Sequence, residues 1–236
     1  MRDNRITIKG PDVNHIKNVL RMRAGEKITA VDEAGGRKWI CEIEELSEDG
    51  VRCGILSEEE ADTELSAKIF LFQGLPKGDK MELILQKAVE LGCSEIIPVV
   101  CRRCVVKLEE KKQRSRVQRW QSISEAAAKQ SGRRIIPQVR DVMRFSQALS
   151  WAADMDVRLI PYEKAEGMIK TKEILGAVKP GQKIAVFIGP EGGFEESEIR
   201  EAESAGVIPV TLGRRILRTE TAAITVLSWL MYALEI

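Results

Sequence analysis

From about residue 67 onward, short apolar runs alternate with longer amphipathic segments. The runs 67–75 (AKIFLFQGL), 94–100 (SEIIPVV), 157–163, 183–193 and 207–213 have the length and composition of strands. Helical segments separate them, among them 77–92, 108–132, 194–206 and 221–234, and the first three of these end at a glycine. This alternation predicts an α/β domain built on a parallel sheet.

The first 66 residues follow a different pattern. In KITAVDEAGGRKWICEIEEL (27–46), two β-prone runs flank Gly35-Gly36, which predicts a hairpin, and 50–56 predicts another strand. One helix is expected over 11–22, where apolar residues recur at helical spacing. The acidic segment 57–66 separates this β-rich pattern from the alternating pattern that follows. We therefore predict two domains, a β-rich one over 1–66 and an α/β one over 67–236.

Composition narrows the class of protein. Hydrophobic residues make up 44% of the chain and charged residues 31%, as in ordinary globular proteins. The polar N-terminus does not resemble a signal peptide, and the apolar run 221–236 is shorter than the roughly 20 residues of a membrane span. We expect a cytoplasmic protein that does not enter the membrane. Cys101 and Cys104 form a C-x-x-C, but the chain has one histidine and no second such pair, so we expect no metal.

Charge is unevenly distributed although the formal net charge is only +1. Residues 1–40 carry nine Lys/Arg against five Asp/Glu, whereas residues 41–66 carry one against ten. Residues 101–144 carry thirteen against four, a block typical of a nucleic-acid surface. A solvated helix face would give the same count, so charge alone leaves both interpretations open.

Ligands of open α/β sheets bind at the carboxyl ends of strands, where this chain has loops at 159–165, 187–198 and 211–223. The second, FIGPEGGFEESE, has neither the P-loop nor the dinucleotide glycine spacing, and its glutamates would repel a pyrophosphate. A nucleoside without phosphates, such as S-adenosylmethionine, fits this loop better. A plain strand-to-helix turn that uses glycines for positive φ is the alternative.

The third loop, TLGRRILRTETAA, combines three arginines with the start of an apolar helix. Thr219 or Thr221 could cap that helix, and Ile216 and Leu217 are expected to form a buried pocket floor. The arginines could hold RNA phosphates or an electron-rich base. A capped helix with surface arginines is the alternative.

IGPEGGFEESEI (188–199) followed by LGRRILRTETA (212–222) resembles the ribosomal RNA small subunit methyltransferase E family, of the SPOUT class of knotted methyltransferases. HIKNVLRMRAGEKITAVD (15–32) resembles that family's PUA-like β-barrel, and 73–92, EAAAKQSGR (125–133) and YEKA (162–165) match as well. The resemblance covers nearly the whole chain, whereas CRRC (101–104) departs from it.

The resemblance implies a homodimer with a trefoil-knotted C-terminal domain. It also implies transfer of a methyl group from S-adenosylmethionine to N3 of a specific uridine in 16S ribosomal RNA, as free RNA or in the small subunit. By residue-to-residue match, the cofactor would be held by Leu159, Pro161, Tyr162, Ile188, Gly189, Pro190, Glu191, Gly192, Gly193, Leu212, Gly213, Ile216, Leu217 and Thr219.

Methylation at N3 requires loss of the N3 proton, and a cation near O2 or O4 would stabilise the anion that forms. We predict that Arg218 supplies this cation and that Glu220 or Glu191 accepts the proton. The RNA would be bound by Arg2, Arg5, Arg21, Arg23, Arg114, Arg116, Arg119, Lys129, Arg133 and Arg134.

Two other functions are compatible with parts of the sequence. In a non-catalytic RNA-binding module, the C-terminal domain would serve only as a dimer scaffold, and S-adenosylmethionine would not bind. In an ordinary nucleotide-binding Rossmann enzyme, ligands that carry phosphates would compete for the site, although the glycine fingerprint is missing.

Overall fold

The chain, seen here as a computed structural model, divides into two compact units, Met1–Thr63 and Glu64–Ile236. The structure describes residues 4–31, 37–59, 63–105, 110–165 and 167–235. Arg2 and the Gly35-Gly36 turn lie outside the described residues. The division falls before Glu64 rather than after Ser66, because Glu64 accepts hydrogen bonds from the backbone amides of Arg134 and Ile135 and so is tied to the second unit.

The first unit is a four-stranded antiparallel sheet with a short helical segment. Its strands are β1 (Arg5–Ile8), β2 (Lys27–Val31), β3 (Lys38–Leu46) and β4 (Val51–Glu59), in the order β1-β4-β3-β2. The predicted helix forms as α1 (Pro11–Asn14) continued by the π-helical η1 (His15–Val19). Val13 and Ile16 from this segment pack with Trp39 and Ile43 of β3 to form the core of the unit.

The second unit contains a parallel sheet. Its strands are β5 (Lys68–Gly74), β6 (Glu95–Val100), β7 (Gln138–Val139), β8 (Met143–Arg144), β9 (Val157–Pro161), β10 (Lys183–Ile188) and β11 (Ile208–Val210). Their order is β11-β9-β10-β5-β6-β7, and β8 pairs with β6. Every strand pair is parallel, which confirms the predicted α/β class.

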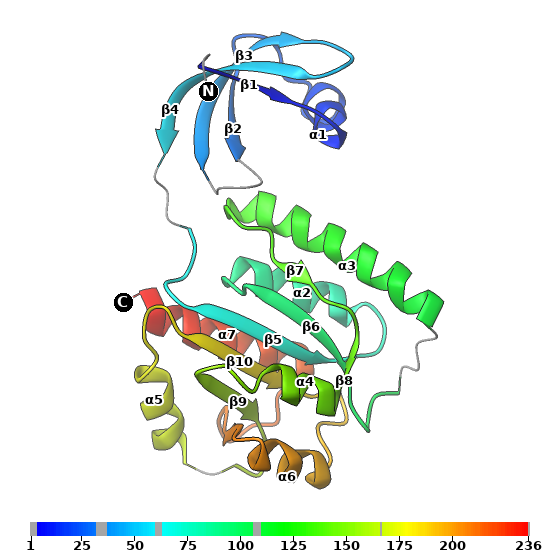
Figure 1. Ribbon diagram of the computed structural model, residues 1–236, viewed down its shortest axis with the longest axis vertical. Coiled ribbons are helices and arrows are strands. Elements are labelled where there is room, and N and C mark those ends of the chain that lie inside the picture. The colour runs from blue at the N-terminus through cyan, green and yellow to red at the C-terminus, as the bar shows by residue number, and fades with distance from the viewer. Residues whose placement is uncertain (1–3, 32–36, 60–62, 106–109, 166, 236) are drawn as a thin grey trace. The chain divides into compact units, whose positions relative to one another are not determined.

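Helices cover both faces of this sheet (Figure 1). The helices α2 (Lys80–Glu90), α3 (Glu110–Ser131), α5 (Met168–Gly176) and α7 (Thr219–Glu235) contribute to one apolar cluster, and α4 (Phe145–Trp151) and α6 (Glu196–Ser204) to the other. The central strands are apolar on both sides: Ile184 and Val186 of β10 face the first cluster, and Ala185 and Phe187 face the second. Such burial on two faces explains why these strands read as continuous apolar runs.

Parallel pairing brings the carboxyl ends of the strands to one edge of the sheet. Ile188 at the end of β10 lies opposite Gln73 near the end of β5. The segments that follow β6, β9, β10 and β11 therefore emerge at the same edge, where a ligand site is expected.

Candidate cofactor pocket and RNA surface

A pocket of about 870 Å³, including its open mouth, lies at this edge. The segments after β9, β10 and β11 and the first turns of α7 form most of its wall. Apart from Leu159, every residue predicted to hold the cofactor lines this pocket. Leu159 is fully buried in the core beside the pocket. Three loops that are distant in sequence thus converge on one cavity.

The pocket also contains residues that were not predicted to hold the cofactor. They are Arg103, Glu163, Phe194, Thr211, Ala222 and Arg215, the last of which is one of the three arginines noted in the loop 211–223. Ile216 lines the pocket but is 85% exposed, so the expectation that it forms a buried floor is wrong. Ile216 lies in a short loop before α7 where none of the described elements covers it, whereas the neighbouring Leu217 is half-buried.

Close backbone approach explains the glycines of the loop after β10. A Cβ at Gly189 would lie 3.1 Å from the carbonyl carbon of Gly193, and one at Gly192 would lie 3.2 Å from the Cβ of Arg103. Gly193 has a φ of +66°, which other residues rarely adopt. A Cβ at Gly74, at the end of β5, would lie 2.7 Å from the backbone nitrogen of Pro190. Side chains are therefore excluded from several points where this loop folds back or meets β5.

Glu191 is held by hydrogen bonds within the protein. Its Oε1 accepts one from the Lys77 amide at 2.9 Å and one from Lys80 Nζ at 2.8 Å. Partial burial acts to raise its pKa, but these hydrogen bonds outweigh burial and hold the pKa below its ordinary value. A carboxylate that is stabilised in this way is a poor proton acceptor. The geometry thus favours a role in holding the loop against the segment before α2, rather than the predicted role as base.

The other glutamates of the loop are also engaged. Glu195 and Glu198 form a capping box at the start of α6, with each side chain accepting from the backbone of the other. Glu198 is buried, and its Oε1 also accepts from the Arg102 amide at 2.8 Å. Glu196 pairs with Lys164. The glutamates of this loop therefore cap α6 and form ion pairs. The sequence interpretation considered only that they would repel a pyrophosphate.

A buried hydrogen-bond chain links the pocket wall to the sheet. Gln73 Nε2 donates to Thr219 Oγ1 at 2.9 Å, and Thr219 Oγ1 donates to the Gly189 carbonyl at 2.7 Å. Both side chains are buried. Thr219 thus fastens the start of α7 to the glycine loop, a different role from the predicted helix cap.

The remaining predicted catalytic residues lie at the start of α7. Arg218 is exposed and is not among the residues that line the pocket. Glu220 lies in the first turn of α7, and its Oε2 is a buried atom without a hydrogen-bond partner among the described residues. Neither side chain lines the pocket wall, although Thr219 between them does.

The C-x-x-C segment forms a turn after β6. The Cys101 amide donates to Cys104 Sγ at 3.2 Å, and Cys101 is buried against the sheet, as expected of cysteines that pack near a strand end. The hydrogen bond between the two thiols raises the pKa of Cys101 and lowers that of Cys104. Within the described residues, no cluster of His, Cys, Asp or Glu has the arrangement of a metal site.

In the first unit, the predicted RNA-binding arginines are on the surface. Arg5 pairs with Glu44 at 2.9 Å, and both side chains are more than a third exposed. Arg21 and Arg23 are exposed, and Arg21 has a φ of 53°, which turns the chain after η1. Arg2 lies outside the described residues.

In the second unit, α3 carries most of the basic block. Arg114, Arg116 and Lys129 are exposed, and Arg119 is exposed while paired with Glu82 at 2.8 Å. These side chains can meet a polyanion.

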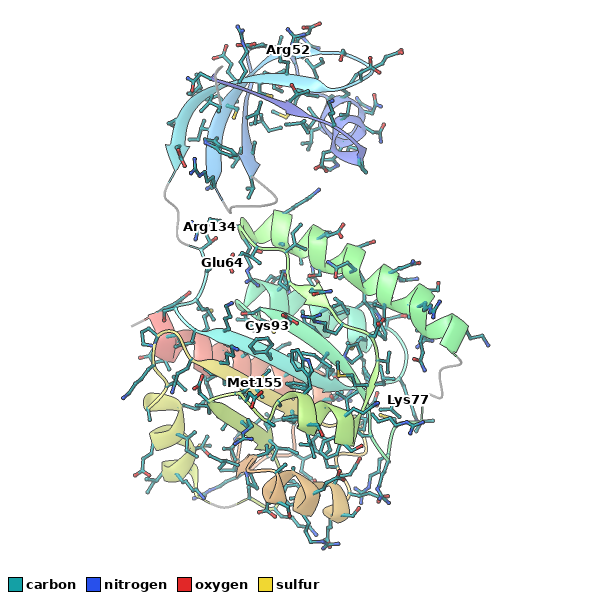
Figure 2. All side chains as sticks on the ribbon, viewed as in Figure 1. Arg52, Glu64, Lys77, Cys93, Arg134 and Met155 are labelled. Atoms are coloured by element: carbon teal, nitrogen blue, oxygen red, sulfur yellow. The ribbon has the colours of Figure 1, made fainter. Side chains whose placement is uncertain are left out.

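Arg133 does not belong with them. Its side chain is 4% exposed, forms an ion pair with Glu64, and donates from Nη1 to the carbonyls of Val89 and Cys93. Figure 2 shows Glu64 beside Arg134, whose amide donates to Glu64 Oε1 at 3.0 Å. The geometry therefore removes Arg133 from the predicted RNA surface, because its guanidinium is used inside the protein.

Among the described segments, none of the helices combines the length and apolarity that a membrane span needs.

The sequence of this chain matches known families and a curated relative. A family model for an RNA methyltransferase domain matches residues 63–231, and one for an RNA methyltransferase PUA domain matches residues 8–56. The chain is 38% identical over 233 residues to a ribosomal RNA small subunit methyltransferase E of Bacillus subtilis, covering 98% of this chain and 91% of the relative.

Solved structures agree. A crystal structure of a protein described as hypothetical has a TM-score of 0.93 at 37% identity, covering 99% of this chain and 93% of that one. A ribosomal RNA small subunit methyltransferase E of Neisseria gonorrhoeae, bound to S-adenosylmethionine, has a TM-score of 0.81 at 35% identity, covering 95% of this chain and 90% of that one.

Proposed function

Because this chain belongs to the RNA methyltransferase family, with ribosomal RNA small subunit methyltransferases E among its relatives, we propose that it methylates N3 of a uridine in 16S ribosomal RNA. S-adenosylmethionine is the methyl donor that we assign to it, since a relative of the same description binds this cofactor. The observation that supports the proposal most is the convergence of three loops on one pocket. The homodimer, the knot and a cytoplasmic site of action are part of the same proposal.

The pocket fits this cofactor in its chemistry. Apolar Ile188, Leu212 and Leu217 lie beside a loop whose glycines keep backbone groups accessible, as an adenosine requires. The positively charged residues among those lining the pocket are Arg103 and Arg215, and the Gly-Lys-Ser/Thr ending of a triphosphate loop is missing. S-adenosylmethionine, when bound, supplies an electrophilic methyl group.

The protein's own residues must then align the uridine and manage one proton. Holding N3 in line with the methyl group supplies much of the rate enhancement. Of the two glutamates predicted as proton acceptors, we favour Glu220, because Glu191 is held by Lys77 and Lys80 while Glu220 Oε2 accepts no hydrogen bond from any described residue. Glu220 does not line the pocket, so in this proposal it takes the proton through a water molecule.

The test uses small ribosomal subunits and protein-free 16S RNA from cells that lack this protein. Each is incubated with the purified full chain and S-adenosylmethionine, and nucleosides are analysed by mass spectrometry. New N3-methyluridine supports the proposal. Calorimetry separates the alternatives: absence of S-adenosylmethionine binding favours an RNA-binding module, and displacement by nucleotides favours a Rossmann enzyme. An unchanged N3-methyluridine level in both substrates contradicts the proposal.

A further inference from the structure

The turn that follows β6 carries a basic residue directly into the pocket. Arg103 lies in this turn between the two cysteines and is the only part of the segment 101–104 that lines the pocket. Its Nη1 donates a hydrogen bond to the Gly192 carbonyl at 2.8 Å, and its Cβ packs where a Gly192 side chain would be. The guanidinium is therefore held at the glycine loop by one hydrogen bond, and the start of its side chain lies close to the backbone of Gly192.

The backbone of this turn is braced from two sides. Within the turn, the Cys101 amide donates to Cys104 Sγ, which closes the turn on itself. From α6, the buried carboxylate of Glu198 accepts from the Arg102 amide, and Glu195 lies 3.8 Å from Arg102 Nη1. Two helix-capping glutamates and the C-x-x-C thus fix the position of the residue between them.

Arg103 retains hydrogen-bonding capacity beyond its contact with Gly192. A guanidinium has five N–H donors, and the hydrogen bond to Gly192 uses one of them. Glu196, whose pKa is lowered mainly by its hydrogen bond with Lys164, also interacts with the charge of Arg103, but no carboxylate in the described part of the chain forms an ion pair with Arg103. The side chain is exposed at the pocket mouth, so the remaining donors can reach a second ligand that enters after the cofactor.

The two other candidate arginines lack these properties. Arg215 lines the pocket, but no hydrogen bond or ion pair to its side chain fixes its direction among the described residues, and it is exposed. Arg218 is exposed and does not line the pocket. Electrostatic catalysis depends on charges that are already in place before the reaction, which favours the residue with fixed geometry.

We propose that Arg103 is a catalytic residue that binds O2 or O4 of the target uracil and stabilises its negative charge as N3 loses its proton. This inference rests on the proposed function. The N3–H proton leaves to an acceptor, the N3 electron pair forms the new bond to the methyl carbon, and the electrons of the broken S–C bond stay on sulfur as a thioether. Charge on the uracil develops between the first two events, where a guanidinium lowers its energy most.

Four variants test the assignment: Arg103→Ala, Arg103→Lys, Arg102→Ala and Arg218→Ala. Each is measured for S-adenosylmethionine affinity, RNA affinity and single-turnover methyl transfer from neutral to alkaline pH. Arg103→Ala is expected to lower the methyl-transfer rate about 100-fold at neutral pH, with both affinities changed less than about threefold. Arg103→Lys keeps the positive charge but not the planar guanidinium with its several donors, so its methyl-transfer rate should fall less. Arg102→Ala is the matched control for a purely structural effect, because it removes an adjacent charge and its contact with Glu195 while Arg103 stays in the pocket.

The pH dependence supplies the decisive readout. Alkaline pH ionises the uracil without help, so the deficit of Arg103→Ala should shrink as pH rises. A deficit that is equal at every pH, with weaker RNA binding, would mean a phosphate contact and overturn the inference. An equal loss of cofactor affinity would mean that Arg103 only braces the loop. The same pH-dependent loss in Arg218→Ala with an active Arg103→Ala would also overturn it. If the unaltered protein forms no N3-methyluridine, the proposed function fails instead.

Discussion

The side-chain amide of Gln73 donates to the hydroxyl of Thr219 at 2.9 Å, inside the core and between two loops of the pocket. Thr219 passes the interaction on to the Gly189 carbonyl at 2.7 Å. The end of β5, the start of α7 and the glycine loop are therefore fixed relative to one another by one hydroxyl.

Thr219→Val removes this hydroxyl with little change of shape. It leaves the Gly189 carbonyl without its donor and removes one of the two acceptors of the Gln73 side-chain amide, which also donates to the Gly74 carbonyl at 2.9 Å. The expected result is a free energy of unfolding lowered by about 1–3 kcal/mol. S-adenosylmethionine affinity should fall as well, because the two loops lose their connection. Denaturant unfolding and calorimetric titration measure the two effects. Thr219→Ser retains the hydroxyl and should stay near the unaltered protein; equal losses in both variants would contradict this role.

Glu191 makes the stability of the folded protein depend on pH in the acidic range. Its pKa in the folded protein is lowered from 4.5, so its contribution is fully present above that value and is lost as pH falls through the lower folded pKa. In Glu191→Gln, the melting temperature should accordingly fall less steeply below about pH 4.5 than in the unaltered protein.

The same variant tests whether Glu191 is the base. If Glu191 only holds the loop, the pH–rate profile of methyl transfer near neutrality keeps its shape in Glu191→Gln. Loss of an ionisation from that profile would restore Glu191 as the proton acceptor.

The ion pair between Glu64 and Arg133 is predicted to be a large contributor to the stability of the second unit. In Glu64→Ala, Arg133 stays buried without its carboxylate, and the expected cost is about 3–5 kcal/mol. Glu196→Gln removes an exposed ion pair with Lys164 in the same unit and should leave the free energy of unfolding nearly unchanged. Thermal and denaturant unfolding of the full chain compare the two; similar costs would refute the structural role of Arg133.

RNA binding should depend on salt through the exposed arginines of α3. Removing one phosphate contact with Arg116→Ala is expected to weaken binding and to reduce the slope of log affinity against log salt by about 1. Arg52→Ala, in the acidic part of the first unit, serves as the control. Fluorescence anisotropy over a salt series measures both slopes, and an unchanged slope for Arg116→Ala would remove this face of α3 from the RNA surface.

Sequence periodicity located the larger elements but not the small ones. The apolar strands β5, β6 and β10 and the helix α7 can be recognised in the sequence, because their buried positions require apolar residues. The seven-residue α4 and the two-residue strands β7 and β8 were not predicted, since elements of that length hold too few positions to show a period. Their positions are set by neighbours that are remote in the chain.

Site contacts between residues close in the sequence could be predicted, whereas contacts between residues far apart in the sequence could not. The capping box of Glu195 and Glu198 spans three residues and could have been recognised from its spacing. The partner of Arg133 lies 69 residues earlier, so a charge count assigned this buried arginine to the surface. Arg103 was not predicted as a pocket residue, because the predicted site included only the loops after β9, β10 and β11. The loop after β6 also follows the carboxyl end of a parallel strand, and this position could have indicated Arg103.

The glutamates that follow the glycine loop have a consequence for how the substrate arrives. Glu191, Glu196 and Glu198 each face a lysine or a backbone N–H within the protein. The ion pairs with Lys80 and Lys164 offset the charges of Glu191 and Glu196, so these two carboxylates add little long-range repulsion around the pocket entrance. If the exposed arginines of α3 form the RNA surface that we propose, we expect them to steer RNA toward the pocket and to set the association rate, with little opposition from these two paired glutamates.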